Sequence, residues 1–224
     1  MKLSHVYKTF YPDTPKEVKA LTDINLTFEK GEFTTLSGES GSGKTTLLNI
    51  IGGLDSATSG EIFFEGEEIT AYSEEKMAKL RLEEIGFIFQ AYNLIHVLTV
   101  RENIGFIMKL LKFDEKEIEA RVLELASILQ IEEILDKLPG EISGGQQQRV
   151  AVARAVASRP KLILADEPTA NLDSKNSERL MNMLRTLNEK EHVTVIFASH
   201  DKYVLELSKR IIVLDDGVVI EDRC

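Results

Sequence analysis

Alternating apolar and polar positions predict strands in the first ninety residues. Residues 24–29 alternate strictly, which is typical of a strand with one buried face. Residues 33–36 predict a second strand, and the apolar positions within residues 46–51 predict a helix after a glycine-rich loop. Residues 61–66 predict a short strand that ends in a turn. Residues 85–89 predict a strand that is buried on both faces.

The pattern becomes helical between residues 91 and 158. Residues 99–102, Thr-Val-Arg-Glu, have the spacing of a capping box, in which the first and last side chains bond each other's backbone N–H groups at a helix start. Asp114 can cap a second helix and Ser143 a third, which Pro160 would stop. We therefore expect a helical segment of about three helices here.

The final third of the chain returns to alternating strands and helices. Residues 161–166 form an apolar run that ends in an acid, as expected of a buried parallel strand whose carboxyl end meets a ligand. Residues 180–187 predict an amphipathic helix, residues 193–198 a strand, and residues 211–220 a hairpin. The whole pattern predicts an α/β core that is interrupted by one helical insertion.

Composition and net charge indicate what kind of globular protein this chain forms and which partners are excluded. The 224 residues are 43% apolar and 29% charged, which is ordinary for a globular protein. No apolar run approaches the roughly 18 residues that a membrane span needs, and the N-terminus lacks the apolar stretch of a secretory signal, so we expect a cytoplasmic location. The net charge of −10 opposes binding to nucleic acid. The single cysteine, Cys224, is interpreted as an incidental exposed thiol.

Residues 38–45 read Gly-Glu-Ser-Gly-Ser-Gly-Lys-Thr, between a predicted strand and a predicted helix. This strand–loop–helix setting is what a phosphate-binding loop requires, because glycines let backbone N–H groups turn toward a polyphosphate. The helix N-terminus adds its positive dipole end. Lys44 would reach the β- and γ-phosphates, and the Thr45 hydroxyl would ligate Mg²⁺. We call residues 38–45 the phosphate loop.

Two acids follow the apolar run of the final third. Asp166 ends the predicted strand and suits the carboxylate that holds Mg²⁺ in phosphate-loop enzymes. Glu167 lies one residue further and is a candidate general base for the water that attacks the γ-phosphate. An isolated acid pair would be a solvated turn, but the phosphate loop makes the functional interpretation the stronger one.

Residues 141–149 read Glu-Ile-Ser-Gly-Gly-Gln-Gln-Gln-Arg, and they indicate which class of nucleotide-binding enzyme this chain resembles. They resemble the signature of the ATP-binding cassette (ABC) family, with Ile142 where leucine is usual. The resemblance covers essentially the whole chain, and the motifs that carry it stand in the family's order: residues 38–45, Gln90, residues 142–146, residues 162–167, residues 171–173 and residues 199–200. We call residues 142–146 the signature segment.

The resemblance implies a fold: a RecA-like P-loop NTPase core with an N-terminal antiparallel β subdomain and an inserted α-helical subdomain. It also implies a single ABC ATPase domain over residues 1–224. Within it, residues 1–90 and 159–224 would form the nucleotide-binding core, and residues 91–158 the helical signature subdomain.

The resemblance also implies site roles. Gln90 is similar to the glutamine that contacts Mg²⁺ and the attacking water, and His200 to the switch histidine that reaches the γ-phosphate. Asp173 resembles the family's D-loop acid at a dimer interface, although it could equally cap the next helix. Adenine would stack on an aromatic residue near the first strand; Phe10 is favoured by register and Tyr11 is the runner-up. The remaining implied contacts with ATP are Gly38, Glu39, Ser40, Gly41, Ser42, Gly43, Lys44, Thr45 and Thr46.

In the family the signature segment completes the ATP site of a second subunit. The resemblance thus implies that two copies close head to tail around two ATP molecules, with Ser143, Gly144, Gly145 and Gln146 acting in trans. Hydrolysis by Glu167, His200, Gln90 and Lys44 would release the closed dimer, with the metal held by Thr45, Gln90 and Asp166.

Short segments of the sequence, among them residues 52–55 and 166–173, resemble those of one group of cassette ATPases. This group contains the lipoprotein-release, macrolide-export and cell-division ATPases. Members of this group drive membrane permeases. Because this chain shows no membrane span, its permease would be a separate polypeptide, and the protein would lie at the cytoplasmic face of the cell membrane; its cargo stays unknown. A soluble cassette acting in DNA repair or translation is the alternative. A phosphate-loop GTPase would need an Asn-Lys-x-Asp motif, which is absent, and a phosphate-loop kinase would not need residues 143–146. A cassette that binds ATP without turnover lacks support because Lys44, Asp166, Glu167 and His200 are all present.

Overall fold

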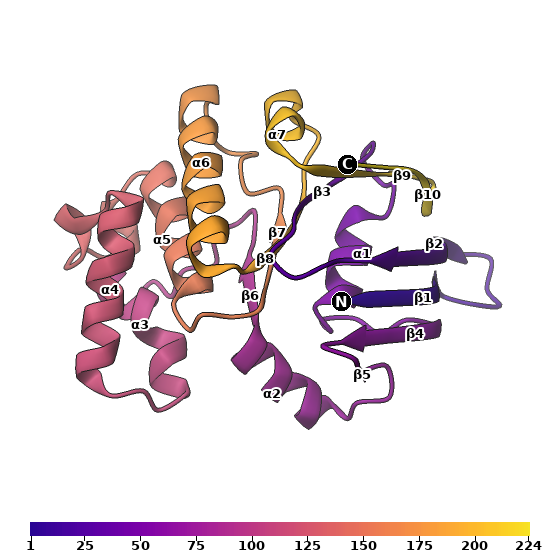
Figure 1. Ribbon diagram of the computed structural model, residues 1–224, viewed down its shortest axis with the longest axis horizontal. Helices are drawn as coiled ribbons and strands as arrows, with labels where there is room; N and C mark the ends of the chain where they lie inside the picture. The colour runs from indigo at the N-terminus through magenta and orange to yellow at the C-terminus, as the bar shows by residue number, and fades with distance from the viewer.

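Two β-sheets and a group of helices make up the fold. The computed structural model describes residues 1–224, apart from the side chains of residues 202 and 203. The smaller sheet is antiparallel and lies at one end of the molecule (Figure 1). Its strands, in the order β2-β1-β4-β5, are β2 (Val18–Thr27), β1 (Lys2–Phe10), β4 (Ser59–Phe64) and β5 (Glu67–Glu68).

The larger sheet has six strands, of which five are parallel. The antiparallel strand β10 forms one edge next to β9, so the C-terminal residues make the predicted hairpin. In spatial order the strands are β10 (Val218–Arg223), β9 (Arg210–Asp215), β3 (Phe33–Ser37), β8 (Thr194–Ala198), β7 (Leu162–Asp166) and β6 (Ile85–Ile88).

Strand β7 shows why its sequence is apolar without alternation. Leu162 and Leu164 pack into a core shared with the antiparallel sheet and α1 (Lys44–Ile51), whereas Ile163 and Ala165 pack into a core shared with the helices. Successive side chains of a strand point to opposite faces, so a strand covered on both faces must be apolar at every position. This confirms the predicted α/β core with a doubly covered parallel sheet.

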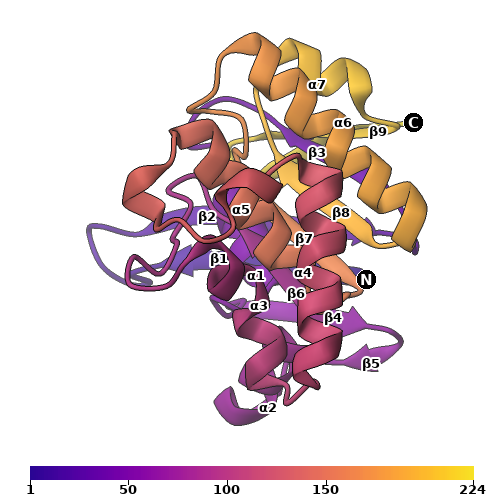
Figure 2. The same cartoon turned by 90° about the vertical axis from the view of Figure 1, so that its left-hand side faces the viewer.

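The helices within residues 100–191 gather on the side of the larger sheet away from the antiparallel sheet, whereas those of residues 44–51 and 74–84 pack on the core shared with that sheet (Figures 1 and 2). Thr99, Asp114 and Ser143 each accept a hydrogen bond from the backbone of their helix's first turn, which confirms the three predicted caps. The helices are α2 (Glu74–Glu84), α3 (Val100–Leu110), α4 (Glu115–Leu129), α5 (Gly144–Val156), α6 (Ser174–Glu191) and α7 (Lys202–Leu207). Two short 3₁₀ turns, Glu132–Ile134 and Pro139–Glu141, link α4 to α5.

None of the helices in the described part of the chain has the length and apolarity that crossing a bilayer requires. The division of the chain into a core of residues 1–90 and 159–224 and a helical segment of residues 91–158 stays a prediction. Helices α3, α4 and α5 all belong to that segment and lie side by side in both views (Figures 1 and 2).

A buried arginine joins three helices. The Arg121 side chain in α4 is 4% exposed. Its guanidinium donates to the backbone oxygens of Val156 and Ala157 at the end of α5, at 2.8 and 3.2 Å. It also bonds Glu124 on its own helix at 2.9 Å and Glu191 at the end of α6 at 2.9 Å. Because α5 and α6 each end here, one side chain fixes the C-terminal ends of both helices.

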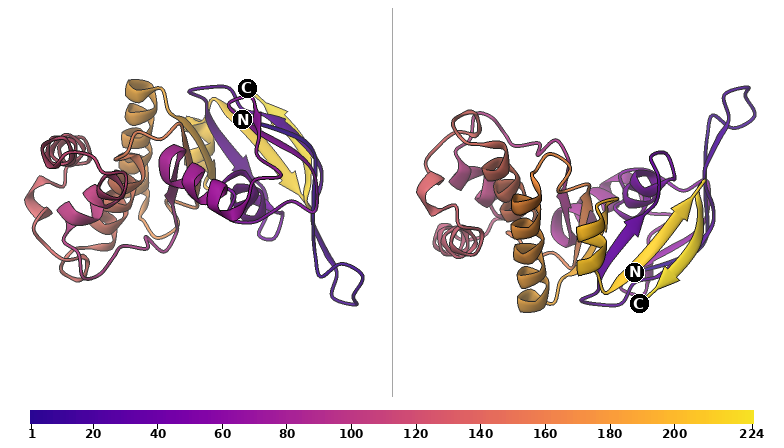
Figure 3. Two further views of the ribbon diagram at one scale, coloured as in Figure 1. Left: turned by 90° about the horizontal axis from the view of Figure 1, so that it is seen from below. Right: turned by 90° about the horizontal axis from the view of Figure 1, so that it is seen from above.

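Strand β1 was not predicted as an alternating segment, and a bulge explains why. The buried positions within residues 2–10 include Leu3, Val6 and Lys8, so the spacing is three and then two. His5 has a φ of 49°, and the register against β2 shifts between Leu3 and Val6. A bulge inserts one residue into a strand and thereby breaks the period-two pattern on which the prediction relies. Beyond β1, the loop of residues 11–17 protrudes from the body (Figure 3).

Candidate functional site

The phosphate loop connects β3 to α1 and is packed against backbone on two sides. Gly38 has a φ of 144°, and a Cβ placed there would lie 2.2 Å from the backbone oxygen of Leu214 in β9. Gly43 has a φ of 102°, and its Cβ would lie 2.7 Å from the backbone oxygen of Ala20 in β2. At both positions only glycine combines the left-handed backbone with the space available.

Replacing Gly38 with alanine is therefore expected to damage both the fold and the site. The added Cβ would have to displace β9, which we expect to lower the free energy of unfolding by about 1–3 kcal/mol. We expect ATP affinity to fall more than tenfold, since the loop backbone must move. Thermal unfolding and equilibrium ATP binding would measure the two effects.

Gly140→Ala is the matched control for this variant. A Cβ at Gly140 meets no atom within 4 Å, and Gly140 is not among the glycines with positive φ. The same glycine-to-alanine change should therefore leave both measurements close to the parent protein. Equal effects of the two substitutions would contradict the argument from the packed loop.

Lys44 begins α1, and its side chain turns back over the loop. Its ammonium donates to the backbone oxygens of Gly38 and Glu39, at 2.8 and 2.7 Å, and lies 3.5 Å from the Ser42 hydroxyl. The residue is 7% exposed. The loop therefore holds a buried positive charge next to the N-terminus of a helix, which is an environment that stabilises phosphate.

A cavity of about 470 Å³ opens beside the loop. Phe10 lines it, and Tyr11 does not; Tyr11 is 67% exposed and has a φ of 51°. The other predicted residues on its wall are Ser40, Gly41, Gly43, Lys44, Thr45, Thr46 and Glu167. The structure thus brings an aromatic ring, the phosphate loop and an acid to one cavity, and the runner-up Tyr11 lies outside its wall.

Thr45 and Asp166 meet across two elements. The Thr45 hydroxyl at the start of α1 lies 3.1 and 3.0 Å from the two carboxylate oxygens of Asp166 at the end of β7. Burial raises the pKa of Asp166, and the neighbouring Glu167 carboxylate raises it further, while the Thr45 hydrogen bond and Lys44 oppose the shift. A half-buried carboxylate beside a hydroxyl is an oxygen pair that suits a hard divalent cation.

The raised pKa of Asp166 has a consequence for stability. The folded protein binds this proton more tightly than the unfolded chain does, so the charged carboxylate destabilises the fold at neutral pH, and this cost disappears as pH falls through the raised pKa. Without nucleotide or Mg²⁺, Asp166→Asn is expected to raise Tm by a few degrees at pH 7. The gain should vanish in acid, which thermal scans against pH would reveal.

Asp173→Asn is the control with the opposite sign. Hydrogen bonds from the backbone and side chain of Asn176 lower the pKa of Asp173, so its charged form stabilises the fold above its ordinary pKa. This variant should lower Tm at pH 7. A lower Tm for Asp166→Asn as well would show that the Asp166 carboxylate stabilises the empty protein.

Glu167 and His200 form a second pair. Glu167 follows β7 with a φ of 46°, and its backbone N–H donates to the oxygen of Ala198 at 3.1 Å, so the turn is fixed to β8. The Nδ1 atom of His200 lies 3.2 Å from a carboxylate oxygen of Glu167. Left-handed backbone at a non-glycine residue costs free energy, and such strain is concentrated at functional sites. The structure thus places two of the predicted catalytic residues in contact with each other.

Gln90 and Asp173 lie outside the cavity wall. Gln90 is exposed, and its backbone oxygen accepts a hydrogen bond from the Asn171 side chain at 3.1 Å. Asp173 accepts from the Asn176 backbone N–H at 2.9 Å and so caps α6, which is the second interpretation that its sequence allowed. Its D-loop role stays a prediction.

The signature segment belongs to the N-terminus of α5. Ser143 and Gln146 bond each other's backbone N–H groups in a capping box. Ser143 and Gly144 are exposed. None of residues 142–146 lines the 470 Å³ cavity in the described structure. The signature segment therefore lies outside the cavity of its own chain, and its action on a second copy stays a prediction.

Comparisons with known proteins fit this geometry. A family model described as ABC transporter matches residues 21–170. The chain belongs to the ABC transporter family. The bacitracin export ATP-binding protein BceA of Halalkalibacterium halodurans is 41% identical over 219 residues, which cover 98% of this chain and 86% of that protein. The lipoprotein-releasing system ATP-binding protein LolD 1 of Chlorobium chlorochromatii is 39% identical over 224 residues, covering 100% and 91%.

A solved structure resembles the whole ABC cassette described here. It is a dimeric post-hydrolysis state of the ATP-binding cassette MJ0796, from Methanocaldococcus jannaschii, bound to ADP and Pi. The TM-score is 0.90 with 41% sequence identity, and the match covers 99% of this chain and 97% of that chain. The ABC cassette fold and the family resemblance predicted from the sequence are thus confirmed.

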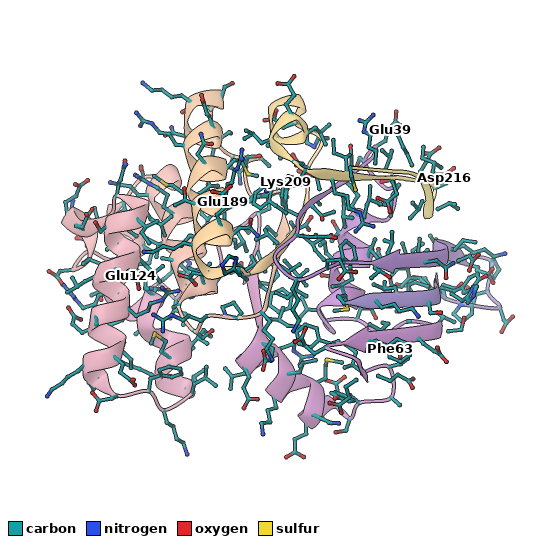
Figure 4. All side chains as sticks on the ribbon, in the orientation of Figure 1. Glu39, Phe63, Glu124, Glu189, Lys209 and Asp216 are labelled. Carbon is teal, nitrogen blue, oxygen red and sulfur yellow. The ribbon has the colours of Figure 1, made fainter. Side chains whose placement is uncertain are left out.

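Five residues that line the cavity of this ABC cassette were not predicted as site residues from the sequence. Gly217 sits in the β9–β10 turn, donates its N–H to the Ser42 oxygen at 3.1 Å and accepts from Thr22 at 2.8 Å. Figure 4 shows Asp216 and Glu39 at the same end of the molecule. The five are Val18, Lys19, Ala20, Asp216 and Gly217. Of these five, the sequence indicated only Asp216 and Gly217, as part of a predicted Asp-Asp-Gly turn. A turn motif does not indicate that a ligand binds nearby.

Proposed function

We propose that this ABC cassette is the ATP-hydrolysing subunit of a transporter, active as a homodimer that closes around two ATP molecules and drives a membrane permease on another chain. One observation carries the proposal. The cavity of a single chain is lined by phosphate-loop residues and Glu167, Asp166 contacts Thr45 and His200 contacts Glu167 beside it, and the signature segment lies outside this cavity. A site built in this way needs a second copy to complete it.

ATP binding uses the wall of the 470 Å³ cavity. Adenine stacks on Phe10, the backbone N–H groups of residues 38–43 and the start of α1 surround the phosphates, and Lys44 neutralises the β- and γ-phosphates. The glycine cradle that a Cβ would fill supports this fit. Thr45, Asp166 and Gln90 would hold Mg²⁺, which supplies charge neutralisation at the phosphates when it is bound.

Hydrolysis depends on the Glu167–His200 pair. A water oxygen attacks the γ-phosphorus, its proton passes to the Glu167 carboxylate, and the bond from the γ-phosphorus to the bridging oxygen breaks to give ADP and phosphate. His200 orients the Glu167 carboxylate through the 3.2 Å contact of its Nδ1 and approaches the γ-phosphate with its other ring edge. The turn that fixes Glu167 to β8 keeps the carboxylate in place.

The second copy contributes its signature segment. Two chains related by a two-fold axis place Ser143, Gly144, Gly145 and Gln146 of one copy against the ATP of the other, where the N-terminus of α5 offers N–H donors to the γ-phosphate. Asp173 lies at the start of α6 and contacts the partner across the interface. Closure excludes water, and loss of the γ-phosphate bond reopens the dimer.

The permease would contact an apolar groove of about 430 Å³ between α2, β6 and the helices α3 and α5. Phe87, Phe106 and Arg154 are among the residues that line this groove. The Arg154 guanidinium donates to the backbone oxygens of Tyr92 and Asn93, which follow Gln90 closely in the chain. A permease segment bound in this groove would therefore contact Arg154 and could shift the chain segment that contains Gln90. The names of BceA and LolD, which denote an export protein and part of a releasing system, support transport, and the protein would then sit at the cytoplasmic face of the membrane.

The experiment that tests this function measures phosphate release from ATP by the purified chain as a function of protein concentration, with and without Mg²⁺. We expect specific activity to rise with concentration until the dimer saturates, and to vanish without Mg²⁺. Activity that is independent of concentration down to the monomer would overturn the shared site. Co-purification from detergent-solubilised membranes would identify the permease.

A further inference from the structure

Lys8 is a buried cation that the proposed hydrolysis does not use. The residue is 8% exposed, although lysine is rarely buried without a partner. Its ammonium donates to a carboxylate oxygen of Asp55 at 2.6 Å and to the backbone oxygen of Ser56 at 2.8 Å. The same ammonium lies 4.7 Å from the centre of the Phe10 ring. Two strong hydrogen bonds and one aromatic face thus account for its surroundings.

Lys8 contacts the Phe10 ring but does not line the cavity. The 4.7 Å distance between the ammonium and the ring centre makes Lys8 and Phe10 neighbours on β1. Phe10 lines the 470 Å³ cavity, and Lys8 does not. The ammonium that contacts the ring therefore belongs to a residue outside the cavity wall.

The partners of Lys8 connect this ring to α1. Asp55 and Leu54 both donate their backbone N–H to the oxygen of Asn49 in α1, at 3.2 and 2.8 Å, so the turn that carries Asp55 is fixed to the end of that helix. The other end of α1 begins with Lys44 at the phosphate loop. One short helix therefore sets the position of the phosphate loop at its start and of Lys8 after its end.

We propose that Lys8 is a positioning residue for recognition of the nucleotide base. It holds the Phe10 ring at a fixed distance from the phosphate loop, so that a purine stacks on the ring while the triphosphate lies on the loop. This inference rests on the proposed role of Phe10 as the base platform. It concerns the base alone, so a triphosphate without a base is bound independently of Lys8.

The test compares ATP with inorganic tripolyphosphate, each in the presence of Mg²⁺, as ligands of the full chain. In Lys8→Met, which keeps the aliphatic length but removes the charge, we expect ATP to bind about three- to tenfold more weakly, as loss of a cation–π support for a stacking ring implies. Tripolyphosphate affinity should stay within about twofold, because the phosphate loop is unchanged. Calorimetric titration would measure both dissociation constants.

Two further variants keep the test decisive. Asp55→Asn retains Lys8 but weakens its anchor, and is expected to reduce ATP affinity in the same direction by less. Lys2→Met is the matched control, because Lys2 lies on the same strand with its ammonium 5.8 Å from the centre of the Phe63 ring, away from the cavity. It removes a comparable cation–π contact and should leave both ligands unaffected.

Combination with Phe10→Ala separates the inference from the function on which it rests. Phe10→Ala should weaken ATP alone, and adding Lys8→Met should weaken it no further. Unchanged ATP affinity in Phe10→Ala would overturn the base platform and the Lys8 inference with it. If Phe10→Ala weakens ATP but Lys8→Met does not, or if Lys8→Met weakens ATP and tripolyphosphate equally, the Lys8 inference alone is overturned. Should Lys8→Met fail to fold, the same criteria apply to Asp55→Asn.

Discussion

Replacing Glu167 with glutamine is expected to reduce ATP turnover at least about a hundredfold, the lower end of the range that a general base contributes. Glutamine has the shape of glutamate but cannot accept the water's proton. Its amide can keep the contact with His200 and the fixed turn beside Ala198, so the geometry of the site should survive. ATP affinity should therefore stay within about twofold. Phosphate release and equilibrium ATP binding measure the two quantities on the same preparation.

The same variant should also change the oligomeric state. If ATP closes the dimer and hydrolysis opens it, a protein that binds ATP without cleaving it stays closed, so Glu167→Gln should elute as a dimer with ATP and as a monomer with ADP. Glu75→Gln, an exposed acid in the first turn of α2, is the control and should behave as the parent chain does. A monomer of the Glu167 variant in saturating ATP would contradict the shared site.

Changing Ser143 to tyrosine is expected to lower turnover by a similar factor, but by another route. The Ser143 side chain is exposed at the start of α5 and lies outside the cavity of its own chain. A bulky ring there would obstruct the approach of a partner's γ-phosphate and remove a cap from the helix. ATP binding by the dilute monomer should be unaffected. Turnover at high protein concentration, together with monomer binding, would distinguish these effects.

Asp114→Tyr provides the matched control for Ser143→Tyr. Asp114 is also an exposed residue that begins a helix with a capping box, and its substitution removes a cap from α4. Both variants should therefore lose a similar amount of stability, roughly 1 kcal/mol. Only the Ser143 variant should lose turnover. Weaker ATP binding by the Ser143 monomer would count against its action on a second copy.

Local signals were enough to predict the strands of the core, the caps and the phosphate loop. The caps at Thr99, Asp114 and Ser143 involve partners three residues away or fewer, so their chemistry is visible in a short window of sequence. The phosphate loop can likewise be recognised within a short window of sequence, residues 38–45. The contact between Asp166 and Thr45 is different, because it joins residues 121 positions apart. It became predictable only because parallel strands end at one edge of the sheet.

Contacts without a local signal could not be predicted. Gly217 packs against Ala20 and Ser42, and nothing in the Asp-Asp-Gly turn indicates where in the sheet that turn will lie. Lys8 and Asp55 are 47 positions apart, and a lysine in a strand is usually a solvated residue. The bulge at His5 concealed β1 because it breaks the very alternation that reveals strands. These features depend on the register between strands, which a single sequence does not specify.

The position of Arg121 sets a condition for protein engineering. Its guanidinium belongs to α4, but one of its carboxylate partners, Glu191, ends α6 on the other side of the predicted subdomain boundary. A chimera that exchanges residues 91–158 between related cassettes would replace one member of this pair and keep the other. Unless the donor supplies an arginine at the equivalent position, Glu191 would be left as a nearly buried charge without its partner. Exchanges of this kind should therefore transfer α4 and the last turn of α6 together.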